Sequence, residues 1–280
     1  MKKPKEVIVA KSAGFCFGVE RAIELAYQQV EQKKLTYTYG SLIHNRTVTE
    51  DLSLKGISII DSLEGIFSGA ILIRSHGVGE VVYREIMEKG LELIDGTCPF
   101  VKKIHEIVSD EKNKNKEIII LGNKTHPEVE GILGWCKGRS HVIKNVEELQ
   151  VFQWGKNIEY VVVVQTTFNQ NLFFDMKNEI IQKCNLVNIH ETICSATTRR
   201  QEEAVKLAKK VDQMIVIGDE KSSNTQKLYE ICKEKCRNVI HIETISDLLL
   251  KNVETCSIIG ITAGASTPPV IIKEVVNYYE

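Results

Sequence analysis

Three cysteines occupy the same kind of position along the chain. Cys16, Cys98 and Cys194 each follow a short β-like run and precede a segment with the pattern of an amphipathic helix. They lie 82 and 96 residues apart, so none belongs to a local CxxC loop. Three thiolates that converge in the fold would suit a [4Fe–4S] cluster with three cysteine ligands and one iron open for chemistry. The alternative is three separately buried cysteines, the common fate of an unpaired Cys.

The other cysteines carry no comparable pattern. Cys232 and Cys236 are four residues apart on a predicted helix, but no nearby residue completes a metal site, so packing is the simpler interpretation. Cys136, Cys184 and Cys256 belong to no motif.

Three histidines fall in small, polar loops that follow predicted strands. His44, His76 and His126 lie in YGSLIHN, RSHGVGE and LGNKTHPEVEG. A histidine in such a loop can donate to phosphate or relay a proton near neutral pH. Each could instead be a structural histidine, and their occurrence in equivalent loops favours function.

Glu128 follows His126 by two residues at the start of a predicted helix. One interpretation is a first-turn charge that favours the helix dipole, for which Glu130 is the better candidate. The other is a carboxyl group that delivers a proton inside a closed cavity. Thr166, with Thr167, lies in VVVVQTTFNQ and is either a helix cap or part of the cavity wall.

Hydroxyl and amide side chains precede two predicted helices near the C-terminus. Such residues are ordinary N-caps, and they also form anion sites at helix N-termini. Together with His44 and His76, they would suit a phosphate or diphosphate. The residues are Ser222, Ser223, Asn224, Ser266 and Thr267.

The elements that must position these residues alternate between β and α patterns from end to end. The chain has 280 residues, and its apolar runs predict strands at 5–9, 36–39, 57–60, 70–74, 91–94, 117–121, 139–143, 159–164, 186–189, 213–217, 238–242 and 256–261. Nearly all-apolar strands separated by helices indicate an α/β fold with mostly parallel sheets.

Counting strands from each of the three cysteines predicts three pseudo-repeated units with four strands each. We expect units at 11–97, 98–193 and 194–280, the last completed by the N-terminal strand within 1–10. If the units form a ring, the cysteine loops and the polar loops after the strands would line one central cavity, since ligands of parallel sheets gather at the carboxyl ends of strands.

Composition limits the possible partners. The net charge is −1 and 26% of residues are charged, which gives no broad attraction to nucleic acid. No apolar stretch reaches transmembrane length, and the apolar run near the N-terminus is too short for a signal peptide. We expect a cytoplasmic protein, where eight cysteines indicate metal binding, catalysis or burial and not disulfides.

The motifs together resemble one known family. The segments GFCFGVERAI, LIHNRTV, SHGVG, DGTCPFVKK, GNKTHPEVEG, QTTFN, TICSATTRRQ, KSSNT and ITAGASTP are similar to those of the 4-hydroxy-3-methylbut-2-enyl diphosphate reductases, the last enzymes of the non-mevalonate isoprenoid route. They span residues 14 to about 268. One departure is Lys221, where the family usually has Asn, and we expect it to change the local charge without abolishing binding.

The resemblance implies a trefoil of three α/β domains around a [4Fe–4S] cluster. It implies that Cys16, Cys98 and Cys194 bind the cluster, that His126 and Thr166 line the substrate pocket, and that Glu128 donates a proton. It assigns the substrate diphosphate to His44, His76, Ser222, Ser223, Asn224 and Ser266.

The reaction implied is the reductive removal of the C4 hydroxyl of the allylic diphosphate. The hydroxyl would lie on the open iron, and the reaction would consume two electrons and two protons. The products would be isopentenyl and dimethylallyl diphosphate. The electrons would come from an external one-electron donor such as ferredoxin or flavodoxin.

Two other classes of protein are possible alternatives. A non-redox [4Fe–4S] dehydratase or condensing enzyme, like quinolinate synthase, would take a carboxylate substrate, against which the Ser-Ser-Asn loop and THPEVEG argue. A redox sensor or zinc-stapled binding protein would need an effector segment or four locally spaced ligands, and the sequence offers neither.

Overall fold

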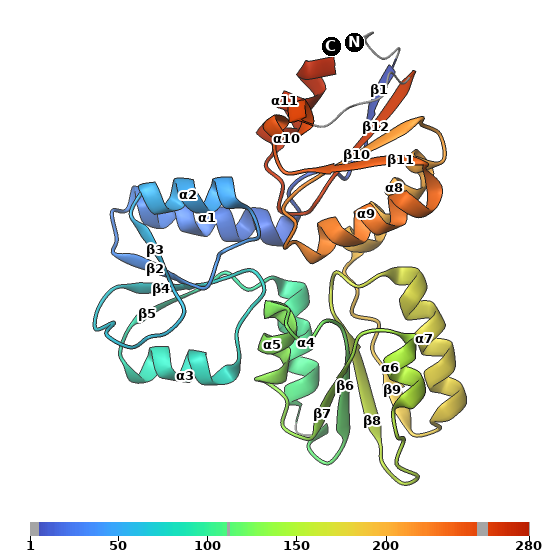
Figure 1. Cartoon of the computed structure of the whole chain (residues 1–280). Helices are drawn as coiled ribbons and strands as arrows, with labels where there is room; N and C mark the ends of the chain where they lie inside the picture. The colour runs from blue at the N-terminus through green and yellow to red at the C-terminus, as the bar shows by residue number, and fades with distance from the viewer. Residues whose placement is uncertain (1–5, 111–112, 251–256, 280) are drawn as a thin grey trace. The chain divides into compact units, whose positions relative to one another are not determined.

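Three four-stranded parallel sheets, with helices between successive strands, form the protein (Figure 1). The computed structural model describes residues 6–110, 113–250 and 257–279. The predicted α/β class is confirmed. Each predicted strand is found with boundaries within two residues of the expected ones, apart from residues 5 and 256, which lie outside the described ranges.

The first sheet has the strand order β3-β2-β4-β5. Its central strand β4 is AILI, and all four side chains are buried, as expected for a strand covered on both faces. Ile71 and Ile73 pack with Ile86 of α3 in one core. The strands are β2 (Thr36–Tyr39), β3 (Ile57–Ile60), β4 (Ala70–Ile73) and β5 (Glu92–Asp95), and the helices before and between them are α1 (Phe17–Glu31), α2 (Arg46–Leu54) and α3 (Glu80–Glu88).

The second sheet has the order β7-β6-β8-β9. Successive residues of β6 face opposite sides: Ile119 packs with α6 and α7, and Ile120 packs with α4 and α5. The strands are β6 (Glu117–Leu121), β7 (Ser140–Ile143), β8 (Tyr160–Val164) and β9 (Val187–Ile189), and the helices are α4 (Pro99–Ser109), α5 (Pro127–Leu133), α6 (Val146–Val151) and α7 (Gln170–Lys183).

The third sheet has the order β1-β12-β10-β11, so the N-terminal strand lies beside the last strand. Val7 is opposite Ile259 in this parallel pair. Met214 of β10 packs toward α8 and α9, whereas Ile215 packs toward α10 and α11. The elements are β1 (Glu6–Val9), β10 (Gln213–Ile217), β11 (Asn238–Ile242), β12 (Ile258–Ala263), α8 (Ser195–Ala208), α9 (Ser223–Lys235), α10 (Ile245–Leu250) and α11 (Pro269–Tyr279).

The three sheets repeat one topology. Read from the outer strand, the orders β3-β2-β4-β5, β7-β6-β8-β9 and β11-β10-β12-β1 follow the same path. Cys16, Cys98 and Cys194 follow β1, β5 and β9, which are the corresponding edge strands. The fold therefore gives the three cysteines equivalent positions, each relative to its own sheet.

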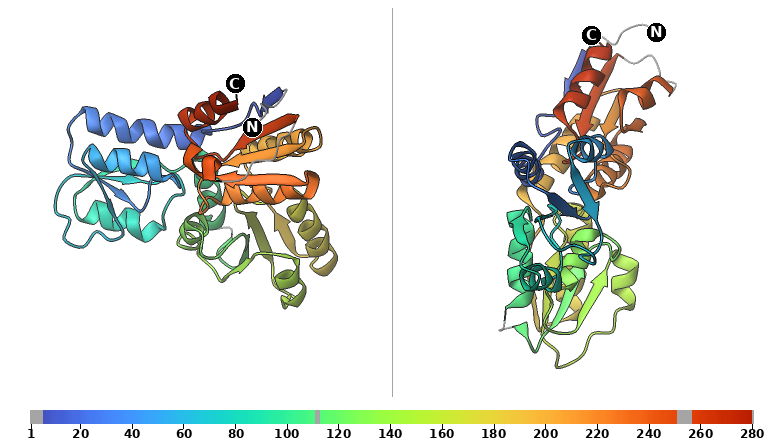
Figure 2. Two further views of the ribbon diagram at one scale, coloured as in Figure 1. Left: turned by 45° about the horizontal axis from the view of Figure 1, so that its top comes forward. Right: turned by 90° about the vertical axis from the view of Figure 1, so that its left-hand side faces the viewer.

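Two compact units can be distinguished in the chain. The first comprises Met1–Glu20, His44–Thr49 and Ser195–Glu280, and the second comprises Arg21–Ile43 and Glu50–Cys194. The individual sheets and their covering helices are seen from two further directions in Figure 2. The three predicted domain ranges stay a prediction, and the site is described below unit by unit.

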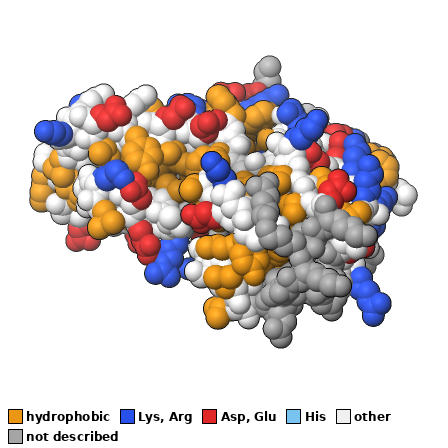
Figure 3. All heavy atoms as spheres, turned by 90° about the horizontal axis from the view of Figure 1, so that it is seen from above, with side chains coloured by type: hydrophobic (Ala, Val, Ile, Leu, Met, Phe, Trp, Pro, Cys, Tyr) orange, Lys and Arg blue, Asp and Glu red, His pale blue; other side chains and the backbone are white. Residues whose placement is uncertain are grey.

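Surface charge and hydropathy agree with the composition. On the face shown in Figure 3, basic side chains are interspersed with acidic and hydrophobic ones. Among the described residues, every helix is too short or too polar to cross a membrane.

Candidate functional site

The first turn of α5 places Glu128 inside the second compact unit. His126 is the N-cap of this helix, and its Nδ1 accepts a hydrogen bond from the backbone N–H of Glu128 at 3.1 Å. Pro127 occupies the first helical position, where the missing N–H costs nothing. The sequence HPE thus fixes the direction in which the helix starts and the place of the carboxyl group.

Thr166, just beyond β8, holds that carboxyl group. Its backbone N–H donates to Oε1 of Glu128 at 2.6 Å, and its hydroxyl donates to Oε2 at 2.7 Å. Both side chains are buried. Burial raises the pKa of Glu128 to about 7, although the two hydrogen bonds from Thr166 act in the opposite direction. The carboxyl group can therefore hold or release a proton near neutral pH.

His126 also contacts His76, which follows β4. The two rings meet edge to face, with centroids 5.3 Å apart and an interplanar angle of 85°. Because Nδ1 of His126 accepts the bond from Glu128, a neutral His126 carries its proton on Nε2. In the second unit, the imidazole of His76 therefore contacts that of His126, which in turn is bonded to the backbone of Glu128.

Cys98 and Cys194 are tied to the same loops by their backbone. The N–H of Cys98 donates to the carbonyl of Ser75 at 3.0 Å, next to His76. The N–H of Cys194 donates to the carbonyl of Thr166 at 3.1 Å. Continuous contacts thus bring together six of the predicted site residues: Cys98, His76, His126, Glu128, Thr166 and Cys194.

Cys16 has the matching bond in the first compact unit. Its N–H donates to the carbonyl of Ala265 at 3.2 Å. Ser75, Thr166 and Ala265 are each the second residue beyond the strand that pairs with the cysteine's strand. The pseudo-repeat therefore extends from the sheets to the hydrogen bonds at the three cysteine loops, and it places Ser266 next to the partner of Cys16.

Ser222, Ser223, Asn224 and Ser266, which we call the anion cradle, also lie in the first unit. Ser222 is the N-cap of α9, and its Oγ accepts a hydrogen bond from the N–H of Thr225 at 3.3 Å. Nδ2 of Asn224 and Oγ of Ser266 are buried and have no hydrogen-bond partner among the described residues. Buried donors without partners are costly, so these two atoms fit a ligand that accepts hydrogen bonds.

His44 and Ser223 lie near the starts of α2 and α9. His44 precedes Asn45, whose Oδ1 accepts a hydrogen bond from the N–H of Val48 in the first turn of α2. Ser223 is the first residue of α9 and is partly buried. Their part in ligand binding stays a prediction.

The cysteines differ in their surroundings. Cys16, Cys98 and Cys194 are partly exposed, and none of the described cysteines is in a disulfide. Burial raises the pKa of Cys232 to about 12 and that of Cys136 to about 11, so these thiols resist ionisation. The packing interpretation of Cys232 and Cys236 fits their burial, and Cys256 lies outside the described residues. Cys16, Cys98 and Cys194 offer three soft sulfur donors at equivalent loop positions, a set that fits iron.

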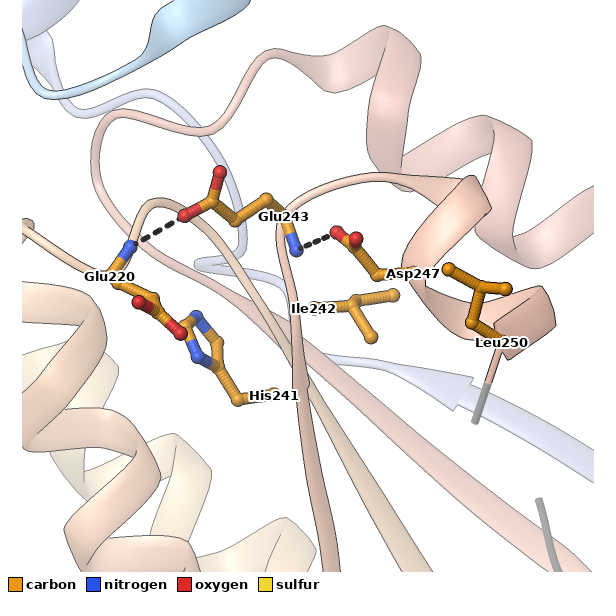
Figure 4. Close-up of a pocket in the computed structure, with 6 residues that line it drawn as sticks. All are labelled: Glu220, His241, Ile242, Glu243, Asp247 and Leu250. Atoms are coloured by element: carbon orange, nitrogen blue, oxygen red, sulfur yellow. Dashed lines mark hydrogen bonds between the residues drawn. The ribbon is translucent and has the colours of Figure 1, made fainter. Parts of the chain in front are cut away.

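A separate pocket of about 270 Å³ borders the loop before α9 (Figure 4). It is lined by Glu220, His241, Ile242, Glu243, Asp247 and Leu250. The backbone N–H of Glu220 donates to Glu243 at 3.0 Å, and the N–H of Glu243 donates to Asp247 at 2.9 Å. Its carboxylates would repel a diphosphate, so this pocket is distinct in chemistry from the anion cradle.

Comparison with known proteins identifies the family. The model of a family described as LytB protein matches residues 7–280. The chain belongs to the LytB protein family.

Relatives cover nearly the whole chain. A 4-hydroxy-3-methylbut-2-enyl diphosphate reductase from Alkaliphilus oremlandii (strain OhILAs) is 46% identical over 278 residues, which are 97% of this chain and 98% of the relative. The structure of the E-1-hydroxy-2-methyl-but-2-enyl-4-diphosphate reductase from Plasmodium falciparum is similar with a TM-score of 0.91 at 29% identity, covering 98% of this chain and 88% of that one.

A second solved structure is that of an (E)-4-hydroxy-3-methyl-but-2-enyl diphosphate reductase described as the terminal enzyme of the non-mevalonate pathway. It is similar with a TM-score of 0.69 at 38% identity, covering 97% of this chain and 98% of that one. The family resemblance inferred from the motifs of this chain is therefore confirmed.

One residue of the anion cradle's surroundings was missed by the sequence analysis. Thr225 is wholly buried, and its Oγ1 lies where the two cradle loops approach each other. A Cβ at Gly218 would lie 2.5 Å from that atom, and a Cβ at Gly264 would lie 2.1 Å from it. The signal was present in the sequence, because glycines in both loops indicate a close approach of backbone to another group.

Proposed function

We propose that the chain is a 4-hydroxy-3-methylbut-2-enyl diphosphate reductase, an oxidoreductase of the non-mevalonate isoprenoid route. The reaction replaces the C4 hydroxyl by hydrogen, consumes two electrons and two protons, and yields water with isopentenyl or dimethylallyl diphosphate. Relatives with this name match the chain from end to end. The observation that carries the proposal is the buried pair of Glu128 and Thr166, because a departing hydroxyl must be protonated where bulk water is excluded.

Cys16, Cys98 and Cys194 would hold a [4Fe–4S] cluster. When bound, the cluster supplies electrons one at a time and an iron without a protein ligand that acts as a Lewis acid. The assignment is supported by the equivalent positions of the three cysteines after β1, β5 and β9. An external one-electron donor in the cytoplasm, such as ferredoxin or flavodoxin, would supply electrons to the cluster.

The diphosphate would bind the anion cradle together with His44 and His76. Asn224 and Ser266 offer buried donors, which phosphate oxygens would satisfy. Ser222 and Ser223 lie at the N-terminus of α9, where backbone N–H groups and the helix dipole favour an anion. His76 would add a further donor, and its ring contact would orient His126.

Glu128 would deliver the proton through Thr166. In the ionised state the Thr166 hydroxyl donates to Oε2 of Glu128. When Glu128 is protonated, the same bond can reverse, so that the carboxyl group donates to the hydroxyl and the hydroxyl hydrogen turns toward the substrate. A pKa near 7 allows Glu128 to be refilled with a proton after each turnover.

The test is anaerobic product analysis. The purified protein should show the broad visible absorbance of an iron–sulfur protein and, with the allylic diphosphate and a chemical reductant, should form isopentenyl and dimethylallyl diphosphate. Glu128→Gln should lower turnover by a factor of about 10² to 10⁴, the usual contribution of general acid catalysis, without loss of pyrophosphate binding. A colourless protein, or one that leaves the alcohol intact, would refute the proposal.

A further inference from the structure

Each helix that follows one of the three site cysteines carries a cation five or six residues after it. These are Arg21 on α1, Lys103 on α4 and Arg200, next to the exposed Arg199, on α8. Two of the three donate hydrogen bonds into a loop that leads to a different site cysteine. None of the three takes part in the chemistry proposed above.

Arg200 is buried in the first compact unit, where its relative exposure is 3%. Its Nη1 donates to the carbonyl of Ala263 at 2.8 Å, and its Nη2 donates to the carbonyl of Gly14 at 2.9 Å. Gly14 is two residues before Cys16, and Ala263 ends β12 just before the loop that carries Ser266. One guanidinium therefore joins the loop of a cluster ligand to the loop of the anion cradle.

Glu203 of the same helix holds the start of the Cys16 loop. Its carboxylate accepts hydrogen bonds from the backbone N–H groups of Lys11 and Ser12, both at 2.8 Å. The pKa of Glu203 is lowered because these hydrogen bonds outweigh the effect of its partial burial. The segment between β1 and Cys16 is thus anchored to α8 at both ends.

Arg21 makes the corresponding bonds in the second compact unit. Its Nη2 donates to the carbonyl of Asp95 at 2.9 Å, and its Nη1 donates to the carbonyl of Thr97 at 3.3 Å. Asp95 ends β5 and Thr97 directly precedes Cys98. As with Arg200, one guanidinium nitrogen donates to the carbonyl of the last residue of a strand, and the other donates to a carbonyl in the loop before a cysteine.

Lys103 occupies the third position without this arrangement. It is five residues after Cys98, and its side chain is exposed. Burial lowers the pKa of His190, in the segment that leads to Cys194, and the charge of Lys103 adds to this effect. A single ammonium group has no planar fork with which to hold two carbonyls. Lys103 therefore provides a natural control with the same charge at the equivalent place.

We propose that Arg21 and Arg200 are positioning residues that hold the Cys98 and Cys16 loops in the geometry that binds and retains the iron–sulfur cluster. The proposal rests on the proposed function only in requiring a cluster at these cysteines. Each guanidinium holds carbonyl groups of the loop that precedes a sulfur ligand. Its positive charge also lies beside a loop whose cysteine must be a thiolate. Without the fork, the loop carbonyls lose their donors and the cysteine gains conformational freedom.

The experiment measures cluster retention and not turnover. Wild type, Arg21→Gln, Arg200→Gln and the control Lys103→Gln are purified anaerobically, and loss of visible absorbance is followed after an iron chelator is added. The variants Arg21→Lys and Arg200→Lys keep the charge and remove the fork. The spectrum of the reduced cluster in electron paramagnetic resonance is recorded for each loaded protein.

Both Gln variants should lose the cluster at least tenfold faster than wild type, with an altered resonance spectrum, whereas Lys103→Gln should match wild type. The Lys variants should lose it faster than wild type too, because charge alone does not hold two carbonyls. Lys variants that retain the cluster at the wild-type rate would overturn the proposal, even if the Gln variants fail to fold. So would an equal effect of Lys103→Gln. A wild-type protein that binds no iron would instead refute the proposed function. The visible absorbance measured before the chelator is added distinguishes this outcome from the others.

Discussion

One residue, Thr166, clamps both oxygens of the Glu128 carboxyl group, with its backbone N–H on Oε1 and its hydroxyl on Oε2. The same residue accepts a hydrogen bond from the N–H of Cys194 through its carbonyl. The group proposed to carry the proton is therefore tied to the loop of a proposed cluster ligand by a single intervening residue. A shift of that loop would be transmitted directly to the carboxyl group.

Replacing Thr166 should change the pH dependence of turnover. The Thr166 hydroxyl stabilises the ionised form of Glu128, so Thr166→Ala should raise the pKa of this carboxyl group further. Because the protonated form is the proton donor, the alkaline limb of the kcat profile should move to higher pH, while kcat itself falls about tenfold or more through loss of the relay. Thr166→Ser retains the hydroxyl and should keep the wild-type profile. A Thr166→Ala profile with an unmoved alkaline limb would contradict the assignment.

Glu128 should also make the stability of the folded protein depend on pH. Its pKa is about 7 in the folded protein and 4.5 in the reference state, so the folded state binds the proton more tightly. This stabilising contribution is complete below pH 4.5 and is lost as the pH rises to 7. At about 1.4 kcal/mol per pH unit, the buried carboxylate costs on the order of 3 kcal/mol above pH 7.

Glu128→Gln removes that cost, since an amide is neutral at every pH and can still accept from the Thr166 N–H. Its free energy of unfolding in urea should exceed that of wild type at pH 8 by a few kcal/mol and by much less at pH 5. Glu130→Gln, at an exposed position on the same helix, should differ from wild type by no more than about 0.5 kcal/mol at either pH. Equal effects of Glu128→Gln at the two pH values would show that this carboxyl group does not titrate near neutrality.

The sheets were predictable from sequence because four of their central strands are almost wholly apolar. AILI, EIIIL, YVVVV and QMIVI can be strands only if both faces are covered, which requires helices on either side. Boundaries were less predictable: β5 begins one residue later than expected, because Leu91 is buried beside the sheet and extends the apolar run, and β12 (Ile258–Ala263) ends two residues later than the expected 261. The site loops followed from the same logic, since polar residues directly after such strands must lie at the carboxyl edge of a sheet.

Contacts between segments that are distant in the chain could not be predicted from the sequence. Glu128 and Thr166 are 38 residues apart, and both were selected, but nothing local showed that one would hold the other. Arg200 and Gly14 are 186 residues apart, and an Arg on a polar helix face is usually solvated. Such pairs depend on which helix covers which strand end, and periodicity does not encode that choice.

The anion cradle can be probed with pyrophosphate, which is not a substrate for reduction. Asn224→Ala and Ser266→Ala each remove a buried donor, and a hydrogen bond to a charged group is worth about 1.5–3 kcal/mol, so each should weaken binding about tenfold or more in calorimetry. Asn145→Ala is the matched control, because Asn145 caps α6 with a bond of 2.9 Å to Glu148 in the other compact unit. This control should lose stability and keep its affinity. Wild-type affinity in both cradle variants would place the anion elsewhere.

Gly264 and Thr225 should be coupled in stability. A Cβ at residue 264 would lie 2.1 Å from Oγ1 of Thr225 and 3.3 Å from its Cβ, and Thr225 is wholly buried. Gly264→Ala should therefore destabilise the protein by about 1–3 kcal/mol, as overpacking usually does. In the double variant with Thr225→Ala the clashing oxygen is gone, so the cost of Gly264→Ala should shrink by more than half. Urea unfolding of wild type, both single variants and the double variant gives the interaction energy directly. Additive free energies would mean that the two cradle loops are not held apart by this hydroxyl, and the glycine would then be required for backbone reasons alone.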